Sequence, residues 1–108
     1  MKTIVTHLSP DLDAIASIWL IKTYLNGWED AEIKLVPSGT TLNNNAPDSN
    51  KNIIHVDTGL GKFDHHQTNK YTSATKLVFE FLIKNCLVDE KEINPLEKIV
   101  NYVNDTDH

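Results

Sequence analysis

The stretch KTIVTHLSPDLDAIASIWLIKTYLNG, residues 2–27, decides the fold class. Residues 2–6 form a short run of β-branched side chains that ends against a polar cluster, which is typical of a strand. Residues 13–25 then carry apolar side chains at helical spacing, and Asn26-Gly27 is typical of a helix C-cap. The stretch therefore predicts a strand followed directly by a helix.

The rest of the chain continues this alternation of strands and helices. Further strands are predicted at residues 31–36 and 52–58, and further helices at residues 74–84 and from Pro95 to about Asn104. Residues 38–52 hold five Asn and form a long loop, either mobile or functional. The order β-α-β-β-α-α predicts an α/β fold: an open, mainly parallel sheet with helices on both faces, in three layers.

The amino-acid composition excludes several classes of function. The 108 residues leave room for one domain. Ten Lys, no Arg and fifteen acidic residues give a net charge of −5, which argues against a broad basic face for duplex nucleic acid. A phosphate substrate stays open, because bound divalent cations can reverse the charge of a small site. The single Cys86 excludes an internal disulfide and a Cys-based zinc site.

The chain shows no sequence signal for a membrane or for export. Its longest mainly apolar run, residues 14–21, is too short to span a bilayer. No signal or transit segment precedes the first strand. We therefore expect a cytoplasmic protein with no membrane partner.

Asp and His side chains gather where the predicted elements end. The groups, in chain order, are His7, Asp11 and Asp13; Asp57 alone; Asp64, His65 and His66; and Asp105 with Asp107. The carboxyl ends of neighbouring parallel strands meet at one edge of a sheet, so we expect the first two groups to face each other across a crevice. Divalent cations relieve the repulsion among so many carboxylates. Carboxylate with imidazole suits Mn²⁺, Fe²⁺, Co²⁺ or Mg²⁺ better than structural zinc, and more than four ligands indicate two ions.

Each of these residues also has an ordinary explanation when it is taken singly. The group after the first strand can be a loop with a helix cap, Asp57 can end a strand, and His65-His66 can be a solvated pair. His55 alternates with Val56 and is interpreted as a packed or surface histidine. A Ser-His-Asp nucleophile is disfavoured, because no G-x-S-x-G turn is present. The joint occurrence of the groups favours a metal site.

Three motifs resemble those of the DHH phosphoesterase superfamily: THLSPDLDAIAS at 6–17, VDTG at 56–59 and FDHHQ at 63–67. They come in the family order and span more than half of the chain. The resemblance is closest to the branch related to metal-dependent exonucleases, and it implies an Mn²⁺-dependent phosphohydrolase or phosphodiesterase with a DHH-domain-like fold.

The resemblance implies how the first two motifs hold metal. His7 and Asp11 would bind one Mn²⁺, and Asp13 would bind the other. Asp57 would bridge the two ions. Mg²⁺ or Co²⁺ could take the place of Mn²⁺.

It also implies roles for the later residues. His65 would bind the second ion, while His66 would contact the substrate phosphate and assist catalysis. Asp64 would act in catalysis by orienting a histidine. Asp105, in an Asp-Thr pair, would be the last metal ligand, with Asp107 as the alternative.

The implied reaction is hydrolysis of a phosphodiester or phosphoanhydride by a hydroxide that bridges the two ions. Its substrate would be a short oligonucleotide, a dinucleotide, or pyro- or polyphosphate. Members of the superfamily continue into a C-terminal substrate-binding domain, which residues 1–108 do not contain. We therefore expect one catalytic domain whose second wall comes from a homo-oligomer or a separate domain. The alternative is a non-catalytic metal- or nucleotide-binding module of the DHH type.

Overall fold

The computed structural model describes residues 1–66 and 71–107, and the predicted order of strands and helices is confirmed. The elements are β1 (Thr3–His7), α1 (Leu12–Tyr24), β2 (Glu32–Val36), the 3₁₀ turn η1 (Leu42–Asn44), β3 (Ile53–His55), α2 (Ala74–Lys84) and α3 (Glu90–Asp107). The turn η1 lies inside the predicted loop at residues 38–52. Among the described residues, no helix is long and apolar enough to cross a membrane.

The last helix begins earlier than predicted. We expected Pro95 in its first turn, but α3 begins at Glu90 and contains Pro95. The side chain of Asp89 accepts a hydrogen bond from the Lys91 amide (3.4 Å), and Glu90 and Glu92 lie in the first turn. Acidic groups stabilise a helix N-terminus, so these residues offset the amide that proline lacks.

The three strands form a parallel sheet in the order β2-β1-β3, as the alternation of strands and helices predicted. Ile4 in β1 lies between Ile33 in β2 and Ile54 in β3. The central strand is buried on both faces, and Ile4 and Val5 are fully buried. The sheet therefore brings the carboxyl ends of β1 and both its neighbours to one edge.

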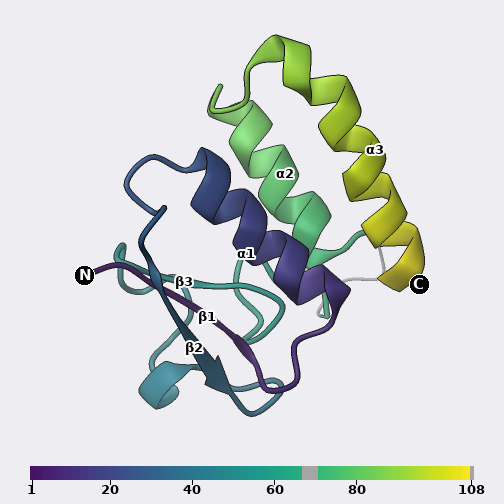
Figure 1. The fold of residues 1–108 in the computed structure, drawn as a ribbon. Coiled ribbons are helices and arrows are strands. Elements are labelled where there is room, and N and C mark those ends of the chain that lie inside the picture. The colour runs from purple at the N-terminus through teal and green to yellow at the C-terminus, as the bar shows by residue number, and fades with distance from the viewer. Residues whose placement is uncertain (67–70, 108) are drawn as a thin grey trace.

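The two faces of the sheet are covered differently. Helices α1, α2 and α3 lie together on one side, and η1 lies on the other (Figure 1). On that other side, the Leu42 amide donates to Nε2 of the buried His55 (3.2 Å), and the Thr58 hydroxyl donates to the Thr40 carbonyl (2.8 Å). In the described residues the predicted α-helix on the second face is therefore replaced by a loop. An Asn-rich segment with Gly39 favours turns over a helix.

The hydrophobic core lies between the sheet and the three helices. Its buried side chains include Ile4, Ile54 and Val56 from β1, β3 and the residue after β3, Ile18 and Ile21 from α1, Val78 and Leu82 from α2, and Leu96 and Val100 from α3. The broad apolar stripe predicted for α1 is only partly buried, because Ile15 and Trp19 are about half exposed. The core thus holds α2 and α3 over the sheet edge at which β1 and β3 end.

Candidate metal centre

The centre begins where β1 and β3 end side by side. The Val56 amide donates to the Val5 carbonyl (2.9 Å), so the chain continues parallel to β1 for one residue beyond β3. His7 closes β1 and Asp57 follows Val56, and Nε2 of His7 lies 3.0 Å from Oδ2 of Asp57. The crevice expected from the strand order is present at this edge.

A tight loop after β3 returns the chain to Asp57. Asp57 has a positive φ of 56°, a conformation that Asp tolerates better than most residues, and Gly59 has a φ of 82°. A Cβ on Gly59 would lie 2.7 Å from Cγ2 of Thr41, so the close approach also requires glycine. The Asp57 amide then donates to the Phe63 carbonyl (2.9 Å). This loop explains why an Asp-His-His sequence seven residues later can reach Asp57.

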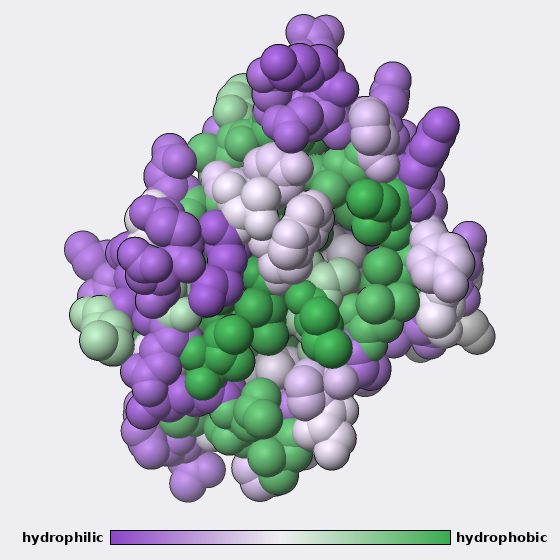
Figure 2. Space-filling model, in the orientation of Figure 1, coloured by the Kyte–Doolittle hydropathy of each residue, from purple (hydrophilic) through white to green (hydrophobic). Residues whose placement is uncertain are grey.

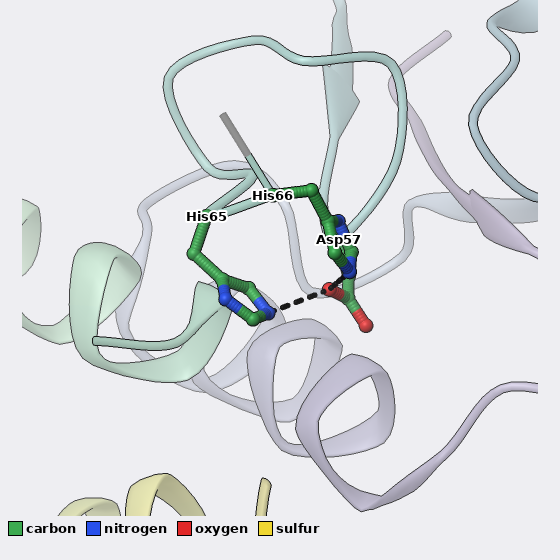
Figure 3. A group of neighbouring side chains, drawn as sticks. All are labelled: Asp57, His65 and His66. Atoms are coloured by element: carbon green, nitrogen blue, oxygen red, sulfur yellow. Dashed lines mark ion pairs between the residues drawn. The ribbon is translucent and has the colours of Figure 1, made fainter. Parts of the chain in front are cut away.

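The carboxylate of Asp57 is the centre of the group. It is 3% exposed, and its Oδ1 accepts no hydrogen bond from the described residues. Nε2 of His65 lies 3.4 Å from Oδ1, and Nε2 of His66 lies 3.8 Å from it. Figure 3 shows both imidazoles converging on this carboxylate. Burial, and then the charge of Asp13, raise the pKa of Asp57 to about 7, although the hydrogen bond from His7 opposes the rise.

His7 presents one defined ring nitrogen to the centre. Its Nδ1 lies 2.9 Å from the Leu8 carbonyl, which can only accept, so Nδ1 carries a proton and Nε2 is directed at Asp57. Burial works against the charged form, but the hydrogen bonds to Leu8 and Asp57 and the charges of Asp57 and Asp11 raise the pKa of His7. A histidine fixed through one nitrogen in this way is prepared to bind metal through the other.

The two aspartates of the first motif occupy different environments. Asp11 is the N-cap of α1, where its Oδ1 accepts from the Ala14 amide (3.0 Å), and its side chain is half exposed. Asp13 belongs to α1 and is buried, and its carboxylate lies against the N-terminus of α2. Its Oδ1 accepts from the Thr75 amide (2.8 Å) and hydroxyl (2.7 Å), and its Oδ2 accepts from the Ala74 amide (3.1 Å). Oδ2 also lies 3.6 Å from Nε2 of His65.

At the end of α3, Asp107 and not Asp105 reaches the centre. Oδ2 of Asp107 lies 3.1 Å from Nε2 of His65. Asp105 is exposed and accepts a hydrogen bond from the Tyr71 hydroxyl (2.5 Å), which raises the pKa of Tyr71. The helical period explains the difference, because Asp107 follows the buried Val103 by four residues and shares its face, whereas Asp105 points elsewhere.

Asp64 holds His66 in place. It is buried, and its carboxylate accepts from the amides of Leu60 (2.8 Å) and His66 (3.2 Å) and contacts Nδ1 of His66. The resemblance implied that Asp64 orients a histidine in catalysis, and that catalytic role stays a prediction. His66 itself is about half exposed and can meet a ligand from solution. Gln67, the last residue of the third motif, lies outside the described residues.

Within the described residues, three overlapping groups have ligand atoms within 4.8 Å of one another. They are His7, Asp11 and Asp57; Asp57, His65 and His66; and Asp13, His65 and Asp107. Asp57 belongs to the first two groups, and His65 belongs to the last two. Five of the six predicted ligands therefore lie together, and Asp107 takes the place of Asp105. The donor set consists of carboxylate oxygens and imidazole nitrogens, which suits Mn²⁺, Co²⁺ or Mg²⁺.

Two cavities flank the groups. One of about 430 Å³ is bordered by His7, Asp11, Ser38, Gly39, Asp57, Leu60, Asp64 and His66. The other, of about 260 Å³, is bordered by Asp11, Leu12, Asp13, Val103, Thr106 and Asp107. Ser38 and Gly39 were not predicted as site residues. They follow β2, whose carboxyl end lies beside that of β1, so the strand order contains a signal for them.

The comparisons with known proteins correct the family read from the motifs. The family model described as ChrB, C-terminal domain, matches residues 4–108. The assignment to the DHH phosphoesterase superfamily is therefore wrong, and so are the labels hydrolase, phosphoesterase and exonuclease-like that came with it. Short His and Asp motifs at strand ends arise wherever an α/β fold builds a polar site at its sheet edge, so they do not define one family.

Searches among curated proteins and among solved structures found no match to this chain. The family assignment therefore rests on the family model, whose match extends over nearly all of the sequence. By this match, the chain belongs to the ChrB C-terminal domain family.

Proposed function

We propose that the chain is a divalent-metal-binding module that holds two neighbouring ions at the carboxyl edge of its sheet. One observation carries the proposal: the carboxylate of Asp57 is buried with imidazoles on both of its oxygens. Oδ2 faces His7 at 3.0 Å, and Oδ1, which accepts no hydrogen bond from the described residues, faces His65 at 3.4 Å. A buried carboxylate oxygen that accepts no hydrogen bond is costly, and bound cations would relieve that cost.

The neighbouring residues supply a ligand set for each ion. His7, Asp11 and Asp57 would hold one ion on the side of the larger cavity. Asp57 would also contact the second ion, together with His65 and Asp107. Asp13 would complete this second set through Oδ2, because both hydrogen bonds at Oδ1 are taken by Thr75.

The proposal is tested by measuring Mn²⁺ binding to the full chain by calorimetry and the bound-metal content after dialysis. We expect about two ions per chain for the native protein, since each of two ligand sets has at least three donors. Asp57→Asn removes the shared negative charge and should weaken binding at both positions by at least about tenfold. Mg²⁺ and Co²⁺ are measured in parallel to rank the ions.

Asp105→Asn is the matched control, because Asp105 is an exposed aspartate outside all three groups. It should leave the number of bound ions and their affinity unchanged. Binding of Mn²⁺ that survives Asp57→Asn at native affinity would refute the proposal. Loss of binding in the Asp105→Asn variant would show that Asp105, and not Asp107, is the metal ligand of α3.

The family match removes the resemblance that implied hydrolysis, so the reaction itself stays an untested prediction. Its assay is release of phosphate or nucleotide from a dinucleotide, a short oligonucleotide, pyrophosphate and polyphosphate, with and without Mn²⁺. Metal binding without turnover of any of these would identify a binding module. Turnover that requires both Mn²⁺ and His66, which borders the larger cavity, would establish an enzyme.

A further inference from the structure

The edge strand β2 leaves part of its backbone open. The sheet order places β2 at the edge, with β1 as its neighbour. The Glu32 amide donates to the Lys2 carbonyl (2.9 Å), and the Val36 carbonyl accepts from the Leu8 amide (2.8 Å). Alternate residues of a strand direct their backbone groups to the same side, so Ile33 and Leu35 direct theirs away from β1. Among the described strands, none pairs with that side of β2.

The side chains of Ile33 and Leu35 are also exposed. They are 45% and 46% exposed, and their register partners in β1 are Ile4 and Thr6. Ile4 belongs to the core beneath the helices, so Ile33 lies on the helix-covered face of the sheet. The open edge therefore combines unpaired backbone with apolar side chains.

Helix α1 extends this apolar surface. Its half-exposed residues Leu12, Ile15 and Trp19 recur at helical spacing on the side turned away from the core. Nζ of Lys22 near the end of α1 donates to the Ala31 carbonyl just before β2 (3.3 Å), which ties the helix to the strand. Figure 2 shows apolar side chains gathered across the face that carries α1 and β2. We call Leu12, Ile15, Trp19, Ile33 and Leu35 the edge patch.

The area of the edge patch suits a small, specific interface. Five large side chains that are about half exposed offer roughly 400–500 Å² of apolar surface, in the range of the largest patches on monomers. If two copies covered each other's patches, the flanking polar groups and the paired backbone would bring the total above about 1,000 Å², the lower end of specific interfaces. Such an interface supports a dimer of moderate affinity.

The charges on β2 make the strand complementary to itself. If two copies of β2 pair antiparallel about Ile33, Ile33 of one copy lies directly opposite Ile33 of the other. The two residues then exchange hydrogen bonds through their open backbone groups. Glu32 of each copy then lies directly opposite Lys34 of the other, twice in the same interface. Opposite charges across a strand pair stabilise it, and like charges destabilise it. A two-fold axis requires this kind of self-complementary surface.

We propose that a second copy of this chain docks on the edge patch, with the two β2 strands paired antiparallel about Ile33. The two sheets then form one continuous six-stranded sheet, and the exposed faces of the two α1 helices approach each other across the axis. Pairing also protects an edge strand that would otherwise be open to nonspecific association. The metal centre does not enter this inference, because none of its ligands belongs to the edge patch.

The test is sedimentation equilibrium of the full chain over micromolar to millimolar concentrations. We expect a reversible monomer–dimer equilibrium. Ile33→Lys should weaken dimerisation at least about tenfold, because it places two like charges at the axis. Lys34→Glu should weaken it as well, because Glu32 of each copy then lies opposite an acidic side chain of the other copy.

The charge-swapped variant Glu32→Lys/Lys34→Glu gives the sharpest result. It should dimerise with itself as the native chain does, yet fail to form mixed dimers with the native chain. Ile99→Lys is the control, since Ile99 is 52% exposed on α3 outside the edge patch. A thermal melt of each variant verifies that it folds. A native chain that stays monomeric, a dimer unaffected by Ile33→Lys, or free mixing of the swapped and native chains overturns the proposal.

Discussion

Two buried aspartates of the candidate metal centre, Asp13 and Asp57, differ in how their oxygens are satisfied. Asp13 accepts two amide hydrogen bonds and one hydroxyl hydrogen bond at the first turn of α2. Oδ2 of Asp57 lies 3.0 Å from Nε2 of His7, and Oδ1 accepts no hydrogen bond from the described residues. The two aspartates therefore have different roles. Asp13 connects α1 to α2, whereas Asp57 lies in an unfavourable environment that a bound cation would relieve.

The largest expected effect is the loss of stability on removing Asp13. Asp13→Ala leaves the Ala74 and Thr75 amides at the N-terminus of α2 without their acceptor in a buried region. Unfolding in urea without added metal should show a loss of about 2–4 kcal/mol. Asp105→Ala, at an exposed aspartate, should change the free energy of unfolding by less than about 0.5 kcal/mol. Equal losses of stability from the two substitutions would contradict the structural role assigned to Asp13.

Asp57→Asn is expected to act in the opposite direction. The amide keeps the shape of the side chain but carries no charge, so the metal-free protein should gain stability at pH 8, on the order of 2 kcal/mol. Mn²⁺ should raise the melting temperature of the native chain more than that of the variant at the same concentration, because the variant binds the ion more weakly. A variant less stable than the native chain at pH 8 would contradict the assignment of Asp57 as an unrelieved charge.

The pH dependence of the metal-free chain sharpens the comparison. The pKa of Asp57 is about 7 in the folded chain and 3.8 ordinarily, so the unfolded chain loses this proton first as pH rises. Its contribution to stability therefore falls between about pH 4 and pH 7 and stays low above that. The raised pKa of His7 acts in the same sense, because its contribution is present below pH 6.5 and is lost at higher pH.

Urea unfolding of the native chain and of Asp57→Asn across this pH range tests that dependence. The native chain should lose stability through the window, and the variant should show a flatter profile. Parallel profiles for the two proteins would show that groups other than Asp57 set the pH dependence.

The smallest effect concerns Thr75, whose hydroxyl donates to Oδ1 of Asp13 (2.7 Å). Thr75→Val removes this hydrogen bond and nearly conserves the volume. It should lower the free energy of unfolding by about 1 kcal/mol, because the amide of residue 75 still donates to Asp13. In the Asp13→Ala background the same substitution should have little further effect, and additive losses would contradict a shared network.

Local patterns in the sequence determined most of the fold. β-branched runs and helical spacing predicted the order of the strands and helices and the parallel sheet, because these signals depend on residues close together in the chain. The strand order then implied that His7 and Asp57 would meet, which depends only on parallel strands ending at the same edge. These local patterns did not identify the family, because short motifs at strand ends recur in unrelated families.

What only the tertiary structure decided were the relations between distant segments. The choice between Asp105 and Asp107 depends on which face of α3 packs inward. The buried hydrogen bonds of Asp13 depend on the approach of α2, which begins 61 residues later in the sequence. The loop that covers the second face of the sheet is held by the buried His55, which no local pattern identifies as its anchor. These contacts join residues far apart in sequence, so packing of the whole chain sets them, and local periodicity does not contain them.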